Sequence, residues 1–139
     1  MRNKILAATA LLTMATTPVF AQSLAIDWKW KLAHQCSASS PAIKVEGIPA
    51  GVTVLEVALV DHDARGFNHG GGSVAHDGKA TSTTIPEGAL KSYKGPCPPN
   101  FHSFGHEYEF TVTAIGSDGK SELARGSAVK NFSAKSVTD

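Results

Sequence analysis

Three polar segments of the sequence carry side chains that could bind a charged ligand. Residues 61–65 contain two aspartates, residues 67–72 contain a histidine followed by three glycines, and residues 95–108 run from a proline-rich stretch to a Gly-His pair. A carboxylate close to an imidazole favours the protonated form of the imidazole. An imidazolium oriented by Asp61 could therefore bind phosphate or a carboxylate, with help from backbone N–H groups of the glycine segment. The aspartates repel an anion, so we expect them to orient a histidine or to contact the ammonium of a zwitterionic head group.

The same residues have a structural interpretation that the sequence alone leaves open. Asp61 and Asp63 could cap a solvated turn through their side-chain oxygens. His106 precedes a predicted strand and could be a structural histidine that is hydrogen-bonded near the strand end. Three further histidines are expected at the surface, namely His62, His76 and His102.

Alternating apolar and polar residues, typical of half-buried β-strands, recur along the chain after the first 21 residues. Strands are predicted at residues 26–32, 43–46, 52–60, 79–85, 108–114 and 121–130. Turns are predicted at residues 47–51 and 117–119, the glycines at 70–72 are interpreted as too flexible for a regular element, and residues 86–90 could hold one helical turn. This pattern predicts an all-β fold, an antiparallel β-sandwich of two packed sheets with Greek-key-type connections and little helix. The polar segments then lie in loops at strand ends, where binding sites usually occur.

The composition is that of one small globular domain without a charge-based partner. The 139 residues are 42% hydrophobic and 18% charged, which excludes a disordered chain. A net charge of +1 leaves no electrostatic footprint for nucleic acid or an anionic lipid surface. No serine lies in a nucleophile-elbow motif, and Cys97 lies among prolines rather than at a strand-to-helix turn. We therefore expect neither enzymatic activity nor a cofactor.

The N-terminus is typical of a secretory signal peptide. Arg2 and Lys4 precede an apolar run at residues 5–15, and a small-residue cleavage site follows. The run is about half the roughly 20 residues that a membrane span requires, so no membrane span is expected. We expect residues 1–21 to be removed and residues 22–139 to form a single domain that is periplasmic or secreted.

Cys36 and Cys97 are the two cysteines of the chain. In an exported domain, an oxidising compartment favours one disulfide between them. Two buried free thiols are the alternative. A zinc site is a weaker interpretation, because neither cysteine belongs to a CxxC pair.

Several short motifs occur in the order that they have in a known family. They are Ser40-Pro41, Gly47-Ile48-Pro49-Ala50-Gly51, Asp61-x-Asp63-Ala64, His69, Gly95-Pro96-Cys97-Pro98-Pro99 and His106-x-Tyr108-x-Phe110. With these motifs, the sequence from about Ser40 to Ala114 resembles the phosphatidylethanolamine-binding protein family, also called Raf kinase inhibitor-like. The proline-rich segment followed by His-x-Tyr is the most specific part. The resemblance implies two packed antiparallel sheets and a small anion pocket in a short, exported bacterial member of the family.

The resemblance also implies which residues form the pocket. They are Asp61, Asp63, His69, Gly95, Pro96, Pro98, His106 and Tyr108. Two prolines of the family pattern are replaced by His62 and Arg65, and no C-terminal helix of the kind that closes the pocket in longer members is recognisable. We therefore expect a shallow, open site.

The sequence is compatible with three functions. The leading prediction is an exported binding module for a small anionic or zwitterionic ligand, such as phosphate or a phospholipid head group. The first alternative is a periplasmic metal-binding protein that uses clustered histidines and aspartates for zinc or copper, although their spacings match no standard motif. Its candidate ligands are Asp61, His62, Asp63, His69, His76, His102 and His106. The second alternative is an inhibitor that presents residues 70–72 to a protein partner which the sequence does not identify.

Overall fold

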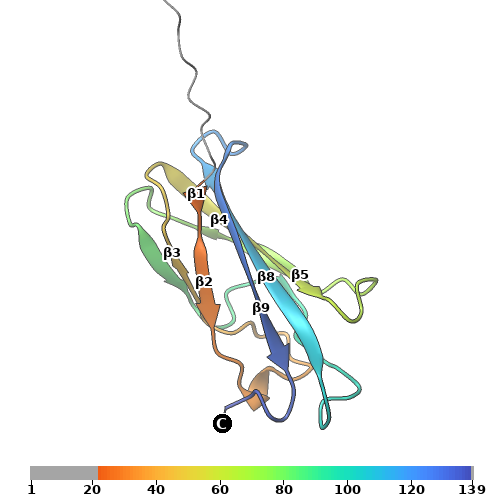
Figure 1. The fold of residues 1–139 in the computed structure, drawn as a ribbon. Coiled ribbons are helices and arrows are strands. Elements are labelled where there is room, and N and C mark those ends of the chain that lie inside the picture. The colour runs from red at the N-terminus through yellow and green to blue at the C-terminus, as the bar shows by residue number, and fades with distance from the viewer. Residues whose placement is uncertain (1–21, 139) are drawn as a thin grey trace, which may run out of the picture.

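The computed structural model describes residues 22–138 and shows two packed β-sheets (Figure 1). The six-stranded sheet has the order β1 (Gln22–Ser23), β9 (Glu122–Phe132), β8 (His106–Gly116), β4 (Val52–Asp61), β5 (Gly70–Ala75) and β7 (Ser92–Tyr93). The three-stranded sheet has the order β2 (Ala25–Trp28), β3 (Ile43–Glu46) and β6 (Ser82–Ile85). Within the described residues the helical content is one short 3-10 helix, η1 (Leu32–His34), which confirms the all-β sandwich with little helix.

The predicted signal peptide, residues 1–21, lies outside the described residues, as does the last residue, Asp139. Among residues 22–138, no helix is long and apolar enough to cross a membrane.

Paired strands run antiparallel, with the exception of β1, which pairs parallel with β9. The chain moves from one sheet to the other between β1 and β2, between β3 and β4, between β5 and β6, and between β6 and β7. Strands that are consecutive in sequence are therefore distributed over both sheets.

The hydrophobic core lies between the two sheets and follows the two-residue period of the strands. Ile43 and Val45 of β3 are fully buried and alternate with exposed lysine and glutamate residues. Aromatic side chains fill the centre, where the ring of Trp30 lies 5.8 Å from Phe110 and 5.3 Å from Phe132. Burial of these apolar side chains holds the sheets together and fixes which strand ends meet.

The strand predicted over residues 26–32 is shorter in the structure, because β2 ends at Trp28. The last pair between β2 and β3 joins Trp28 to Ile43, so a longer ladder would bring Pro41 opposite Trp30. Proline has no N–H group to donate, and it therefore ends the ladder. Trp30 remains buried although it lies outside the strand.

The prediction that residues 70–72 are too flexible for a regular element is wrong, because these glycines begin β5. Strand β5 pairs with β4 on one side and β7 on the other. A Cβ atom on Gly70 would lie 1.9 Å from the carbonyl oxygen of Ser92, and one on Gly71 would lie 1.8 Å from that of Val57. Pairing on both sides therefore orders the segment, and glycine is required because the neighbouring backbones approach too closely for a side chain.

Two smaller predictions also differ from the structure. Strand β6 begins at Ser82 rather than at residue 79, because the Asp77 side chain accepts the backbone N–H groups of Lys79 and Ala80 and closes a turn there. Residues 86–90 form a turn without helix.

The sheet topology brings the three polar segments together. Strand β4 ends at Asp61, which lies opposite Tyr108 near the start of the adjacent strand β8. His69 immediately precedes β5, the neighbour of β4 on its other side. Residues 94–105 connect the edge strand β7 to β8, so they pass across the same end of the sheet (Figure 1).

Candidate functional site

A small pocket lies at this end of the six-stranded sheet and has a volume of about 140 Å³. Its lining residues are Asp61, Ala64, Phe67, His69, Cys97, Pro99, His106 and Tyr108. Broader hollows of about 450 and 480 Å³ occur on the sheet surface, but they are lined mainly by exposed or half-exposed strand residues. The buried ionisable groups Asp61 and His69 distinguish the small pocket from these hollows.

Asp61 is the centre of the polar network in the pocket, and its side chain is only 3% exposed. Its Oδ1 atom accepts the backbone N–H groups of Asp63, at 2.8 Å, and Ala64, at 3.0 Å. Its Oδ2 atom accepts a hydrogen bond of 2.8 Å from Nδ1 of His106. Burial opposes ionisation, but the hydrogen bonds from His106 and the backbone outweigh it and lower the pKa of Asp61. The turn cap and the histidine-orienting role, which the sequence left as alternatives, therefore belong to the same carboxylate.

His106 begins β8 and is held in one tautomer by Asp61. A carboxylate accepts hydrogen bonds, so Nδ1 of His106 carries the proton and Nε2 is left to contact a ligand. The imidazole is 14% exposed and lines the pocket. The preceding Gly105 has φ +61, and a Cβ atom there would lie 2.0 Å from the carbonyl oxygen of Phe132. This close packing sets the position from which His106 enters the strand.

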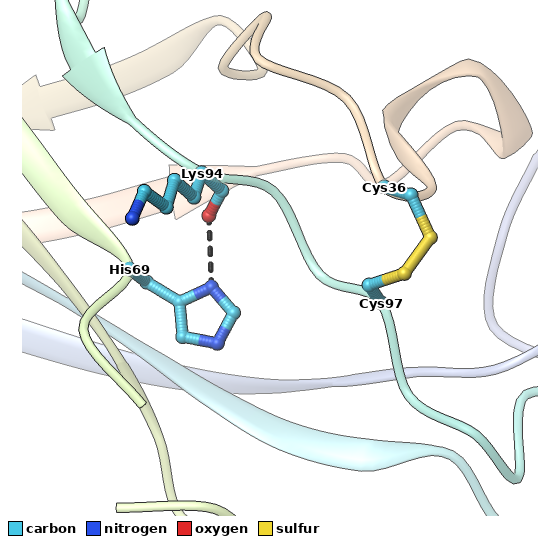
Figure 2. The surroundings of a disulfide bond; sticks show 4 residues. All are labelled: Cys36, His69, Lys94 and Cys97. Atoms are coloured by element: carbon cyan, nitrogen blue, oxygen red, sulfur yellow. Dashed lines mark hydrogen bonds between the residues drawn. A yellow bond between two sulfur atoms is a disulfide. The ribbon is translucent and has the colours of Figure 1, made fainter. Parts of the chain in front are cut away.

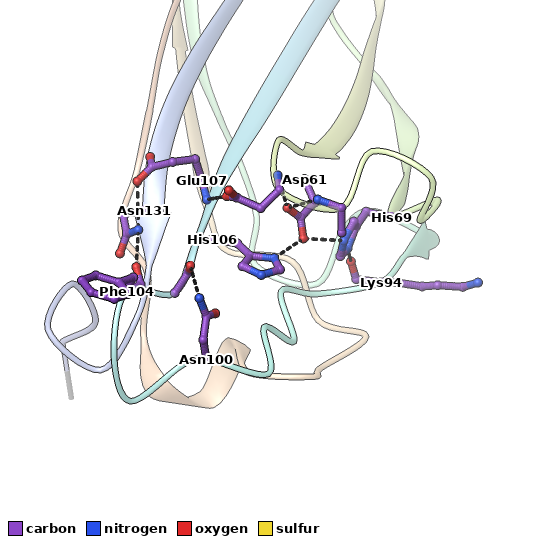
Figure 3. A network of polar contacts seen from close by, with 11 residues as sticks. Asp61, His69, Lys94, Asn100, Phe104, His106, Glu107 and Asn131 are labelled. Carbon is purple, nitrogen blue, oxygen red and sulfur yellow. Dashed lines mark hydrogen bonds and ion pairs between the residues drawn. The ribbon is translucent and has the colours of Figure 1, made fainter.

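His69 contacts the same carboxylate from the other side (Figure 3). Its Nδ1 atom donates a hydrogen bond of 2.8 Å to the carbonyl oxygen of Lys94, and its Nε2 atom lies 3.8 Å from Oδ2 of Asp61. The ring of Phe67 packs against His69 at a centroid distance of 4.6 Å, and the ring of Tyr108 lies perpendicular to His69 at a centroid distance of 5.4 Å. The carboxylate oxygen therefore lies between two imidazoles.

Tyr108 forms the floor of the pocket and is fully buried. Burial raises the pKa of Tyr108, and the neighbouring Asp61 carboxylate raises it further. Its buried hydroxyl group lies beside the Asp61 carboxylate, which keeps the phenol neutral.

One wall of the pocket is the segment 94–99, which we call the wall loop. It supplies Cys97 and Pro99 to the lining, and its Lys94 carbonyl holds His69. Figure 2 shows that the loop is joined to Cys36 by the disulfide Cys36–Cys97, with a Cα–Cα distance of 4.6 Å. The two cysteines are thus paired in the structure, as the sequence predicts.

The predicted site residues divide into two groups. Four of them line the pocket, namely Asp61, His69, His106 and Tyr108. The other four, Asp63, Gly95, Pro96 and Pro98, are not among the lining residues. Asp63 accepts the backbone N–H of Glu107 at 2.8 Å and so braces the ends of β4 and β8. Gly95 packs against the backbone of residues 34–37, which positions the wall loop from behind.

Sequence reasoning missed Ala64, Phe67 and Pro99 as lining residues and treated Cys97 only as a disulfide partner. All four lie inside the polar segments that the sequence singled out. Their side-chain directions depend on how the loops fold against each other, and the residue pattern carries little information on that.

The other histidines lie apart from the pocket. His62 pairs with Glu109 at 2.6 Å, and the exposed His102 packs beside Phe101. The surface expectation for His76 is wrong, because its side chain is 4% exposed and its Nδ1 atom is hydrogen-bonded to the carbonyl oxygen of Val52. Of the seven candidate metal ligands, the described part of the chain gathers three, Asp61, Asp63 and His106, with ligand atoms within 4.8 Å of one another.

Comparisons with known proteins support a family assignment. No curated protein matches the chain significantly. The solved structure of the fn3 domain of human collagen alpha-1(XX) chain is similar over 91% of this chain and 94% of that chain, with 20% identity and a TM-score of 0.42, a likeness too weak to inform on function. The family model of the phosphatidylethanolamine-binding protein matches residues 16–139, and the chain therefore belongs to that family.

Proposed function

We propose that the protein is an exported binding module whose pocket holds a phosphate-like anion, either free or as the head group of a phospholipid. The observation that carries the proposal is the position of one buried carboxylate oxygen between the imidazoles of His69 and His106. When both imidazoles are protonated, the two imidazoliums and the Asp61 carboxylate together carry one net positive charge, and the Asp63 carboxylate lies nearby. A phosphate oxygen can then accept a charge-assisted hydrogen bond from Nε2 of His106.

The pocket volume sets the size of the ligand. At about 30 Å³ per water molecule, a volume of about 140 Å³ corresponds to roughly five waters. This space suits phosphate or a small phosphorylated head group, and any acyl chains would remain outside. Lys94 adds a cation at the margin, with its Nζ atom 5.7 Å from the centroid of the Phe67 ring.

Binding rather than catalysis is the activity that we propose. The lining residues include no serine or threonine, and the sulfur of Cys97 is in a disulfide. Export is proposed from the pattern of residues 1–21 and fits the disulfide between the two cysteines. Membership of the phosphatidylethanolamine-binding protein family supports a head-group ligand.

A divalent metal is the second candidate, because Asp61, Asp63 and His106 gather within 4.8 Å. Both oxygens of Asp61 already accept hydrogen bonds, and Nδ1 of His106 carries the proton that Asp61 accepts. A zinc ion at this nitrogen would have to displace the proton and turn the ring. The hydrogen-bond pattern therefore favours the anion over the metal. The inhibitor hypothesis loses its main feature, since residues 70–72 are paired on both sides within β5.

Calorimetric titration with inorganic phosphate and with Zn²⁺, at about pH 6 and about pH 8.5, tests the proposal. Phosphate should bind more tightly at the lower pH, because protonation of the pocket imidazoles adds positive charge beside the anion. Zn²⁺ should behave oppositely, since protons compete with metal for imidazole nitrogen.

The variant His106→Ala should lose phosphate binding at the lower pH, whereas the matched variant His102→Ala, at an exposed histidine outside the pocket lining, should retain it. Absence of phosphate binding at either pH, combined with tight Zn²⁺ binding at the higher pH, would replace the anion proposal with the metal one.

A further inference from the structure

The two residues of the disulfide Cys36–Cys97 are exposed to solvent, whereas the ionisable residues of the adjacent pocket are mostly buried. Both cysteine residues are exposed, and Cys97 is one of the lining residues of the pocket. By contrast, the ionisable groups Asp61 and His69 beneath it are each 3% exposed. A small thiol in solvent can therefore approach these two residues without unfolding the core, and exposed disulfides are generally the more labile ones.

A short stretch of backbone and one hydrogen bond connect the disulfide to the histidine that flanks Asp61 (Figure 2). The wall loop runs from Cys97 through two residues to Lys94, and the Lys94 carbonyl accepts the hydrogen bond from Nδ1 of His69. The Nε2 atom of His69 faces the carboxylate of Asp61 at 3.8 Å. A displacement of the wall loop therefore changes both the pocket lining and the orientation of His69.

The segment on the other side of the disulfide is held by the bond itself and by backbone hydrogen bonds rather than by a β-ladder. Residues 35–41 belong to no strand, and backbone hydrogen bonds fasten this segment to the wall loop. The N–H of Cys36 donates to the Pro96 carbonyl at 2.8 Å, and the N–H of Gly95 donates to the Ser37 carbonyl at 2.7 Å.

Cys36 itself has φ +52 and is, within residues 22–138, the one non-glycine residue with a positive φ. Non-glycine residues keep this conformation only when their surroundings enforce it. Loss of the covalent link would let Cys36 relax and would leave two backbone hydrogen bonds, from Cys36 and Gly95, to hold the wall loop on its side.

We propose that Cys36–Cys97 is a redox-modification site which sets the geometry, and hence the anion affinity, of the pocket. The effect on affinity rests on the proposed function, whereas the effect on His69 does not. The reductant is a small-molecule dithiol. Its thiolate attacks one sulfur of the disulfide, forms a mixed disulfide and releases the other cysteine as a thiolate.

The second thiol of the reagent then attacks the mixed disulfide, leaves as an oxidised cyclic disulfide and releases the second cysteine. Two electrons pass to the protein, and the two cysteine sulfurs end as thiols after protonation.

Thermodynamic linkage makes the coupling reciprocal. If reduction weakens phosphate binding by a given factor, saturating phosphate must favour the disulfide over the dithiol by the same factor. For a coupling of about tenfold, within the usual range for linked sites, the reduction potential of the bond falls by about 30 mV when phosphate is bound.

The experiment compares oxidised protein with protein reduced by dithiothreitol and with the double variant Cys36→Ser and Cys97→Ser. Calorimetry with inorganic phosphate at about pH 6 should give about tenfold weaker binding in both forms that lack the disulfide. Equilibration in dithiol redox buffers, with and without phosphate, should give the reciprocal shift.

The control variant Leu123→Ala lies in β9 and packs against the core away from the pocket lining. It lowers stability with the bridge intact and should retain the phosphate affinity of the oxidised protein.

A ligand-free measurement keeps the inference separate from the proposed function. Nitrogen NMR of the His69 ring should show a fixed proton on Nδ1 in the oxidised protein and exchange between tautomers after reduction, with the sheet amides unchanged. If oxidised protein does not bind phosphate, the proposed function fails, but the His69 signals still decide the redox inference. Unchanged His69 signals after reduction, or equal phosphate affinity in both redox states, would overturn it.

Discussion

Replacing the buried carboxylate with its neutral isostere, Asp61→Asn, isolates the charge that holds His106. The asparagine Oδ1 can still accept the N–H groups of Asp63 and Ala64, so the turn at the end of β4 survives. The asparagine NH₂ group, however, faces the protonated Nδ1 of His106, and two donors cannot form a hydrogen bond.

The expected loss of stability follows from the loss of this hydrogen bond. A hydrogen bond to a charged group contributes roughly 1.5–3 kcal/mol, and removal of the charge also removes the desolvation penalty of a group that is 3% exposed. We expect the free energy of unfolding to fall by about 1–2 kcal/mol near neutral pH. For a domain of this size, the corresponding fall in melting temperature is roughly 4–8 °C.

The contribution of Asp61 to stability should depend on pH in a definite direction. The folded-state pKa of Asp61 is lowered from 3.8, so its contribution is fully present above that value and is lost as the pH falls through the folded-state pKa. The difference between the wild type and Asp61→Asn should therefore shrink as the pH falls below 3.8.

Urea unfolding under non-reducing conditions measures this difference. Trp28 and Trp30 are 2% and 3% exposed, so their fluorescence reports loss of the core. The matched control is Asp77→Asn, because the Oδ1 of Asp77 also accepts two backbone N–H groups but the residue is exposed. The reasoning is refuted if Asp61→Asn destabilises no more than the control, or if its effect persists undiminished in acid.

Three further predictions concern other parts of the sandwich. Gly71→Ala should destabilise the protein by more than about 2 kcal/mol, because its Cβ would lie 1.8 Å from a β4 carbonyl oxygen, whereas Gly66→Ala, with nothing within 4 Å, should leave the urea midpoint nearly unchanged. Burial lowers the pKa of His34 from 6.5, so stability should be full above that pH and fall as the pH drops below it, and His34→Gln should abolish this part of the pH profile in urea titrations. Burial also raises the pKa of both tyrosines of the chain above 10, so alkaline absorbance titration of the native protein should show no tyrosinate near pH 10, and its appearance there would contradict the buried positions.

The long strands were predictable from the sequence because their pattern is local. Strands β4, β8 and β9 each alternate over about ten residues, and burial of one face enforces the two-residue period. The end of β2 was not predictable in this way, because it depends on Pro41 in the partner strand. Residues 70–72 form a regular strand because they pair with the backbones of β4 and β7, whereas three consecutive glycines alone suggest a flexible segment.

The ionisable residues of the pocket were predictable from the sequence, whereas the apolar residues that line its walls were less so. Asp61 and His106 stand out in the sequence because they lie at the ends of predicted strands and within motifs of the family that the sequence resembles. Gly95 and Pro96 shape the wall from behind, and whether a loop residue faces the pocket is decided by contacts far away in the sequence. The burial of His76 illustrates the same limit, since a single carbonyl of β4 satisfies its ring nitrogen.

The disulfide also has a consequence for the order in which the sandwich can fold. Cys36 and Cys97 are 61 residues apart, and the strands between them, β3 to β7, include members of both sheets. A chain in which this bond is already formed begins folding with Asp61 and His69 inside one closed loop, and part of the entropy needed to bring their strands together is already lost. Since pairings between distant segments limit the folding rate of β-sandwiches, the oxidised chain should refold faster than the reduced one. The same bond then shapes the pocket of the finished protein and shortens the conformational search that builds it.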